Sequence, residues 1–296
     1  MRRSDGRTVG RPGFLLAAMV TSLLTPARAQ TTSSLLEADR AAARRSEECG
    51  FACGLGSALA EGAFYLHNGM PVLHGAGATL AFLQAQDTLL SHRVQWQPLD
   101  ARLSADATFG ITWGVTSVGL RGGPVRFGRY ITAWQREGGA WRIAAHVQTA
   151  LNDAASVSRP DAWQPPALPP LSPPAAIAPF VEADRAFAAQ AGREGAAAAF
   201  AAWAAPEAVV FGPSELIRGP AAIREAFAGP PSQWAWDPVG AGGAGDGSLG
   251  FTVGEATIRR ALPGGGEAVS RSKYLTVWAR MADGGVRYLV DAGNSR

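Results

Sequence analysis

Residues 37–41 read Glu-Ala-Asp-Arg-Ala, and residues 182–186 repeat this motif 145 positions later. Late in each tract follows an aromatic run, Arg-Tyr-Ile-Thr-Ala-Trp at residues 129–134 and Lys-Tyr-Leu-Thr-Val-Trp at residues 273–278. Self-similarity at a nearly fixed spacing indicates that a chain is built from copies of one structural unit. We therefore expect two copies of a single fold, in residues 30–151 and 180–296.

Each tract predicts helices first and strands last, which is typical of an α+β fold with helices on one face of a curved antiparallel sheet. The first tract predicts helices at 33–48, 55–61 and 75–85, a hairpin around Asn68-Gly69, and strands at 92–103, 108–120, 125–136 and 140–149. The second predicts helices at 180–191, 196–204 and 220–228, a hairpin at 209–217, and strands at 234–239, 247–261, 267–281 and 286–292. Eight prolines in residues 152–179 predict an extended linker between the tracts.

One predicted strand is apolar on one face and small on the other. Ile111, Trp113 and Val115 share a face, while the other face carries only Gly and Thr. An antiparallel sheet with one wet face should show polar residues there. We expect the two domains to pack sheet against sheet as an intrachain pseudo-dimer. The alternative is that the small residues only permit curvature of the sheet.

The N-terminus has the features of a secretory signal. Arginines at positions 2, 3, 7 and 11 precede an apolar run at 14–24 and the small-x-small sequence Ala27-Arg28-Ala29. These features predict a signal peptide over residues 1–29, cleaved after Ala29, and a secreted or periplasmic mature protein. The apolar run is shorter than the roughly 20 residues that span a bilayer. Because no Cys stands at the cleavage site, we expect no lipoprotein anchor.

The net charge of +3 lies mostly in the signal segment. Without residues 1–29 the chain has 22 basic and 23 acidic residues, a net charge of about −1. The composition therefore favours neither a nucleic-acid partner nor binding to an anionic membrane. Cys49 and Cys53 are the only cysteines, and their spacing on a helix is within the reach of a disulfide. An oxidising compartment favours the pairing, and the alternative is two small unpaired residues.

Several of these sequence runs are similar to those of a known protein family. The repeated Glu-Ala-Asp-Arg, the run Gly-Phe-Thr-Val-Gly at 250–254, Tyr-Leu-Thr-Val-Trp at 274–278 and Trp-Arg-Ile at 141–143 resemble the nuclear transport factor 2-like (NTF2-like) proteins, nearest to their DUF4440 and SnoaL-like branches. The resemblance covers both tracts and implies a cone-shaped α+β domain. Its members include ketosteroid isomerase, cyclases, dehydratases, and non-enzymatic binding or assembly domains, so it does not choose an activity.

Three residues are candidates for acid–base catalysis. All four histidines lie in the first tract, and His146 on its last predicted strand aligns with Asp291 of the second. In the resembling fold this strand passes near the cone, and histidine suits proton transfer near neutral pH. Tyr130, which recurs as Tyr274, can donate a hydrogen bond to a developing oxyanion, as a tyrosine does in ketosteroid isomerase. The alternatives are a satisfied histidine on a sheet face and core tyrosines.

Other residues are candidates for ligand binding. Trp96, Trp113 and Tyr274 can line an apolar pocket, although core packing explains them as well. His67 is a further candidate, because it flanks the hairpin turn opposite His74 and the two could meet across it, although a surface hairpin explains them equally well. Glu255 shares the apolar parity of its strand, so it either lines a pocket or pairs with an arginine such as Arg271.

Two further groups predict no chemistry. The histidine spacings match no metal motif, and we expect no metal or other cofactor. Glu37 and Asp39, repeated as Glu182 and Asp184, lie two positions apart and so on opposite sides of a helix. We interpret them as a helix N-terminal charge preference and as ion-pair partners of Arg40 or Arg185.

The sequence therefore predicts an exported tandem NTF2-like protein that binds a small apolar molecule in a cone-shaped pocket. One alternative is a cofactor-free SnoaL-like isomerase, cyclase or dehydratase. The other is a non-catalytic assembly module whose cones are filled by their own side chains. These alternatives include both enzymes and non-enzymatic proteins, and the sequence does not choose between them.

Overall fold

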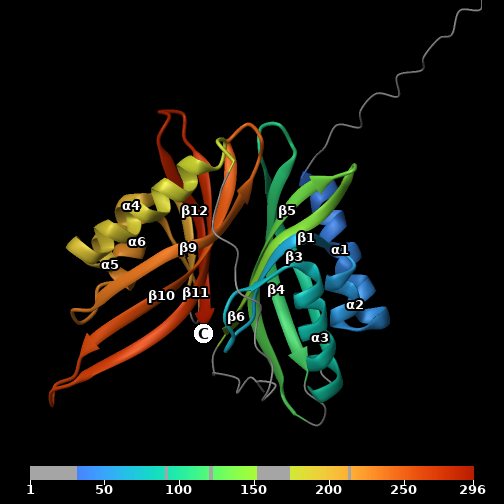
Figure 1. Cartoon of the computed structure of the whole chain (residues 1–296), viewed down its shortest axis with the longest axis horizontal. Helices are drawn as coiled ribbons and strands as arrows, with labels where there is room; N and C mark the ends of the chain where they lie inside the picture. The colour runs from blue at the N-terminus through green and yellow to red at the C-terminus, as the bar shows by residue number, and fades with distance from the viewer. Residues whose placement is uncertain (1–31, 91–92, 120–122, 152–173, 213–214) are drawn as a thin grey trace, which may run out of the picture.

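The computed structural model describes residues 32–90, 93–119, 123–151, 174–212 and 215–296, and Figure 1 shows their arrangement. The first half contains α1 (Thr32–Cys49), α2 (Phe51–Gly56), β1 (Leu59–Leu66), β2 (Leu73–His74), α3 (Ala76–Leu90), β3 (Arg93–Leu103), β4 (Phe109–Gly119), β5 (Val125–Glu137) and β6 (Ala140–Leu151). The second half contains α4 (Ala178–Glu194), α5 (Ala196–Trp203), β7 (Ala204–Phe211), β8 (Leu216–Arg218), α6 (Gly219–Ala226), β9 (Gln233–Gly243), β10 (Leu249–Ala261), β11 (Glu267–Arg280) and β12 (Val286–Ser295). The expected signal peptide and most of the expected linker lie outside the described residues.

The two halves form sheets of the same topology. Their strand orders are β2-β1-β6-β5-β4-β3 and β8-β7-β12-β11-β10-β9. All neighbouring strands are antiparallel except β1 with β6 and β7 with β12, which are parallel, so each sheet is mixed. Helices pack on one face of each sheet, and this confirms the α+β class and the two cone-like domains expected from the repeat.

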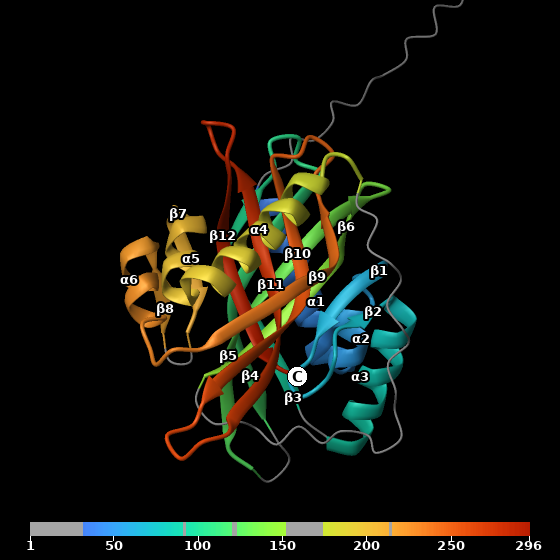
Figure 2. The ribbon, with the colours of Figure 1, turned by 60° about the vertical axis from the view of Figure 1, so that its left-hand side comes forward.

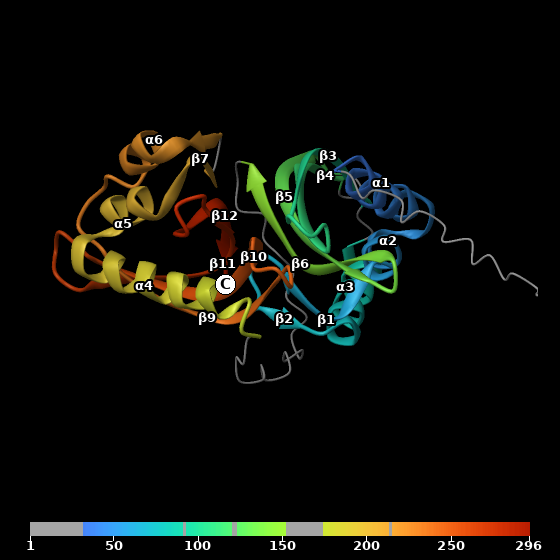
Figure 3. The ribbon, with the colours of Figure 1, turned by 90° about the horizontal axis from the view of Figure 1, so that it is seen from above.

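The sheets of the two domains face each other, with the helices outside (Figures 1 and 3). The Phe251 ring of the second domain stacks on Phe109 of the first at 5.9 Å between centroids and lies 6.4 Å from Phe64. Polar contacts frame this apolar centre: the Asn294 side chain donates to the carbonyls of Leu66 and Gln148 at 2.8 and 2.9 Å. The two domains therefore form an intrachain pseudo-dimer with an apolar core between their sheets, and the first domain has a second core under its helices.

Most expected elements are present, and the main difference concerns the start of the first sheet. The helix expected at 55–61 ends at Gly56, because β1 begins at Leu59 and joins the sheet beside β6. Gly54 lies where α2 packs on α1, and a Cβ there would overlap Ser46. Cys49 and Cys53 form a disulfide across this junction, with Cα atoms 5.7 Å apart. Among the described residues, no helix combines the length and apolar character needed to span a membrane.

Candidate functional site

A buried aspartate lies in each domain, between the first long helix and the sheet. In the first domain Asp39 of α1 accepts hydrogen bonds from the Trp96 indole at 2.7 Å and from the Tyr130 hydroxyl at 2.9 Å. In the second domain Asp184 of α4 accepts the equivalent bonds from Trp236 and Tyr274 at the same two distances. The two networks correspond residue by residue across the repeat.

A second layer of donors completes each network. Thr112 donates to Asp39 while accepting from the Trp134 indole at 2.8 Å, and Thr252 stands between Asp184 and Trp278 in the same way. Both aspartates are almost completely buried. Multiple donors are what a buried carboxyl group requires.

The expectation that these repeated carboxylates form surface ion pairs is therefore wrong for Asp39 and Asp184. The exposed Glu37 pairs instead with Arg44 at 2.6 Å, and Arg185 pairs with Asp237 at 3.1 Å. The helix brings the aspartates inward because they lie on the face opposite to the glutamates.

β6 and β12, the last strands of the two domains in chain order, carry a second pair of equivalent residues, His146 and Asp291. Tyr65 and Thr132 flank His146 in the first sheet, and Val210 and Thr276 flank Asp291 at the same register in the second. The Thr132 hydroxyl lies 2.8 Å from His146 Nδ1, and the Thr276 hydroxyl donates to Asp291 at 2.5 Å.

The side chains of the first domain fill the space around His146. The imidazole ring lies between Tyr65 at 5.7 Å and Tyr130 at 5.8 Å, and only 1% of the residue is exposed. Nε2 has no hydrogen-bond partner among the described residues. Burial lowers the pKa of His146 to about 3, so the ring is neutral at physiological pH and is a weak base. The geometry therefore gives little support to His146 as a base that touches a ligand.

The second domain leaves the corresponding space open. Val210 stands where the first domain has Tyr65, and α6 has 8 residues where α3 has 15 (Figure 2). The cone contains a cavity of about 300 Å³. Its aromatic lining comes from α4, α5, β9, β11 and the end of α6, namely Phe187, Phe200, Phe227, Trp234, Trp236 and Tyr274.

Asp291 supplies a carboxyl group to this aromatic cavity. Burial raises its pKa to about 7, an effect opposed by the Thr276 hydrogen bond and reinforced by the charge of Asp184. Burial also raises the pKa of Asp184, to about 6, although its three hydrogen-bond donors oppose the shift. The two groups differ in exposure: Asp184 is closed off by its donors, whereas Asp291 is half-buried and lines the cavity. Asp291 is thus a titratable group that lines an open cavity and has a pKa near neutral pH.

The two candidate tyrosines already use their hydroxyl protons. A phenol has one O–H, and Tyr130 and Tyr274 donate it to Asp39 and Asp184. Burial raises the pKa of both phenols far above the ordinary value. Tyr274 lines the cavity with its ring, and Tyr130 is completely buried. Neither tyrosine presents a spare donor to an oxyanion in this structure.

The remaining candidates lie in three different places. Trp96 is in the first-domain core, where it packs edge-on against Phe51 at 5.7 Å. His67 contacts Phe82 at 4.9 Å and lies 3.3 Å from the Tyr65 hydroxyl. Trp113 faces the other domain and lines a cleft between the sheets.

Glu255 lies at the domain interface and makes an ion pair, with Arg296 at 2.6 Å instead of with Arg271. Lys273, its neighbour across the β10–β11 pair, is buried and donates to the Ser295 carbonyl at 2.6 Å. Burial lowers the pKa of Lys273 to about 7, and the Glu255 charge opposes this shift. Among the described residues no cluster of three or more His, Cys, Asp or Glu side chains could hold a metal ion.

Three solved structures are each similar to about two fifths of this chain. A ketosteroid isomerase-like protein from Erwinia carotovora atroseptica SCRI1043 is 14% identical, and the match covers 40% of this chain and 94% of that chain at a TM-score of 0.36. An NTF2-like protein with a cystatin-like fold from Novosphingobium aromaticivorans is 15% identical, with 40% and 80% covered and a TM-score of 0.34. An NTF2-like superfamily protein from Salmonella enterica serovar Typhimurium LT2 is 12% identical, with 39% and 87% covered and a TM-score of 0.34. No protein-family model matches the sequence, and no curated protein is significantly similar to it.

Proposed function

We propose that the cone of the second domain binds a small apolar molecule that carries one hydrogen-bonding group. The observation that carries this proposal is the half-buried Asp291 carboxyl group in a cavity of about 300 Å³ with aromatic walls. Apolar pockets with a few placed polar groups are the usual form of small-molecule sites. This volume is at the lower end of such pockets and suits a ligand of about two fused rings.

The raised pKa of Asp291 determines which polar group of a ligand this side chain can bind at each pH. Below about pH 7 the protonated carboxyl donates a hydrogen bond to a carbonyl oxygen. Above that pH the carboxylate accepts a hydrogen bond from a hydroxyl group. We therefore expect ketones to bind better at low pH and alcohols to bind better at high pH.

Two probes with the same ring system test this proposal. The affinity for 2-acetylnaphthalene should fall about three- to tenfold between pH 5.5 and 8.5, and the affinity for 2-naphthol should rise over the same range. Asp291→Asn should remove the contribution of Asp291 to both trends, because the amide does not titrate. Any pH dependence that remains belongs to Lys273, which also lines the cavity. Asp237→Asn, which changes an exposed aspartate of the same domain, is the matched control and should keep both trends. Absence of binding at every pH would contradict the proposal.

The same carboxyl group favours proton transfer as a second candidate function. A carboxyl group with a pKa near the working pH is effective as a general acid or base. If Asp291 acts as a base, the protein should accelerate exchange of the methyl protons of 2-acetylnaphthalene with deuterium from D₂O, followed by NMR. Asp291→Asn should abolish the acceleration. Normal binding with no exchange above background would leave binding as the function of the cone.

The first domain fits a supporting role. Its cone is filled by its own side chains, including Tyr65, Phe82 and Tyr130. Its sheet contributes Phe64, Phe109 and Ile111, among other residues, to the core shared between the domains. We propose that it acts as an intramolecular assembly partner that holds the second domain in place.

We also propose that the protein is exported and cleaved after Ala29. The signal-like N-terminus and the Cys49–Cys53 disulfide support this, because disulfides persist mainly in oxidising compartments. N-terminal sequencing of protein recovered outside the cytoplasm should begin at Gln30. An intact Met1 terminus in the cytoplasmic fraction would contradict export.

A further inference from the structure

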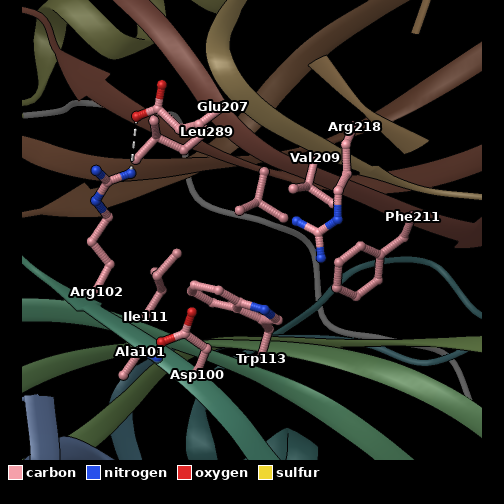
Figure 4. Close-up of a pocket in the computed structure, with 11 residues that line it drawn as sticks. Asp100, Ala101, Arg102, Ile111, Trp113, Glu207, Val209, Phe211, Arg218 and Leu289 are labelled. Carbon is pink, nitrogen blue, oxygen red and sulfur yellow. Dashed lines mark hydrogen bonds and ion pairs between the residues drawn. The ribbon is translucent and has the colours of Figure 1, made fainter. Parts of the chain in front are cut away.

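A second cavity lies between the two sheets, apart from the cone. It has a volume of about 240 Å³ and lies where β3 and β4 of the first domain face β7, β8 and β12 of the second. Figure 4 shows Trp113 at its centre, with Val209 and Phe211 on the opposite wall. Val209 and Val210 are neighbours on β7, so their side chains point to opposite faces, one to this cleft and one to the cone.

The repeat shows why the cleft is open on this side only. Strand pairing makes Val209 equivalent to Phe64, and Asp100 equivalent to Gly240. On the other side of the pseudo-dimer the Phe64 ring occupies the corresponding space against Gly240, where a Cβ would overlap it. Phe64 also stacks on His74 at 4.6 Å between ring centroids. One side of the interface is therefore filled by the Phe64 ring. The other side has Val209 in place of that ring and Asp100 in place of Gly240.

Four charged side chains line the open cleft, and two of them are already paired. Arg102 makes an ion pair with Glu207 at 3.3 Å across the domains. Asp100 and Arg218 make no ion pair within the described part of the chain, and Asp100 accepts only a local hydrogen bond from the Ala101 amide at 2.8 Å. In Figure 4 the Asp100 carboxylate and the Arg218 guanidinium lie on either side of the Trp113 ring. The cleft thus offers an aromatic surface between one free negative and one free positive group.

We propose that this cleft binds an aromatic zwitterion, a molecule with a cationic and an anionic group at opposite ends of a ring. The ring replaces the missing counterpart of Phe64 and packs on Trp113. Its carboxylate pairs with Arg218, whose planar guanidinium suits bidentate recognition, and its ammonium group pairs with Asp100. A purely anionic ligand would meet Asp100 without a partner, and a purely cationic one would meet Arg218.

Three small probes that differ only in charge test the proposal on the full mature chain. They are 4-(aminomethyl)benzoate, with both charges, 4-methylbenzoate, with the anion only, and 4-methylbenzylamine, with the cation only. Dissociation constants come from ligand-observed NMR titrations. Because both protein charges are exposed, each matched charge should contribute about two- to fivefold in affinity, so the zwitterion should bind tightest.

Variants connect the binding to the cleft. Val209→Phe should restore the ring found on the other side and weaken zwitterion binding at least tenfold. Arg218→Gln should reduce the affinity for the zwitterion to that for 4-methylbenzylamine, and Asp100→Asn to that for 4-methylbenzoate. Both of these residues are exposed, so these two variants decide the question even if Val209→Phe folds poorly.

The proposal is overturned if 4-methylbenzoate or 4-methylbenzylamine binds as tightly as the zwitterion, or if a folded Val209→Phe protein binds unchanged. The cone proposal is tested separately, because its naphthyl probes respond to Asp291 and these probes respond to Arg218 and Asp100. Failure of one site therefore leaves the other intact.

Discussion

At the scale of single residues, the second cone contains two carboxyl groups in different surroundings. Asp184 is closed off by donors from Trp236, Tyr274 and Thr252, while Asp291 has the single donor Thr276 and lines the cavity. Such a pair, with two environments and two pKa values, is the arrangement from which acid and base roles arise. We interpret Asp184 as a structural group and Asp291 as the group that meets the ligand.

The raised pKa of Asp291 predicts a pH-dependent loss of stability. The folded protein holds the proton up to about pH 7, whereas an unfolded aspartate releases it near pH 3.8. Between these values the folded state binds more protons, so this group lowers the free energy of unfolding as pH rises. Asp291→Asn should therefore raise the free energy of unfolding at pH 8 by about 1 to 3 kcal/mol and have little effect near pH 4.

Urea unfolding at both pH values measures this difference. Asp237→Asn provides the control. Asp237 is exposed and makes only a surface ion pair, so this substitution should change the free energy of unfolding little at either pH. An Asp291→Asn protein that is no more stable than the wild type at pH 8 would contradict the prediction, because it would show that ionisation of Asp291 costs the folded protein no free energy.

The tyrosine donors of the two networks predict equal effects in the two domains. Tyr274→Phe removes one donor from the buried Asp184, and Tyr130→Phe does the same to Asp39. Each should lower the free energy of unfolding by about 1 to 3 kcal/mol, because a buried carboxyl group loses a partner. Chemical unfolding of both variants checks this, and a change below about 0.5 kcal/mol in either would contradict the assigned role.

The sequence contained the signal for these networks, but we interpreted Asp39 and Asp184 as ion-pair partners and did not connect them with their recurring donors. Asp39, Trp96, Thr112, Tyr130 and Trp134 all recur at corresponding positions of the second tract. A carboxylate that recurs together with its donors indicates a buried network more strongly than a helix-end charge preference. The open cavity could not be predicted in this way, because it depends on the replacement of Tyr65 by Val210 and on the shorter α6.

At the scale of elements, the disulfide ties α1 to α2 beside the first sheet. In the chain-entropy model a bond that closes so short a loop contributes about 2 kcal/mol. The double variant Cys49→Ser/Cys53→Ser should therefore lower the thermal midpoint by several degrees, and a reductant should have the same effect on the wild type. Calorimetry measures both, and the reductant should not affect the double variant. A wild type that is insensitive to reductant would show that the bond contributes no stability.

Strands with clear turn signals at both ends were predicted closely. The strand expected at 125–136 is β5, Val125–Glu137, and the sequence has glycine pairs at 122–123 before it and at 138–139 after it. The start of β1 was missed although Gly54 and Gly56 precede it, because the conformation of Leu59–Glu61 is determined by parallel pairing with β6. Local sequence carries no information about such a distant partner.

At the scale of the whole molecule, the expected packing of one sheet on the other is confirmed, but the face that packs is the apolar one. Ile111 and Trp113 face the other domain. Gly110 and Thr112 of the small face lie against Leu35 and Trp134 on the helix side.

Phe251 is 2% exposed and contacts Phe64 and Phe109 of the other domain. Phe251→Ala should cost about 3 to 5 kcal/mol and weaken the coupling between the domains. Calorimetry should show one cooperative transition for the wild type and a broadened or split transition for the variant. Two separate transitions in the wild type would contradict a shared core.

The dissociation constant of 2-acetylnaphthalene at pH 5.5 for Val210→Tyr tests directly whether the open second cone is the ligand site. This variant introduces into the second cone the residue that fills the first, where Tyr65 lies against His146. Tyr65→Val serves as the matched change in the first domain, and thermal unfolding verifies that both variants fold. We predict that Val210→Tyr binds 2-acetylnaphthalene at least tenfold more weakly than the wild type, while Tyr65→Val binds it with the wild-type affinity. Unchanged binding to a folded Val210→Tyr protein would contradict the account.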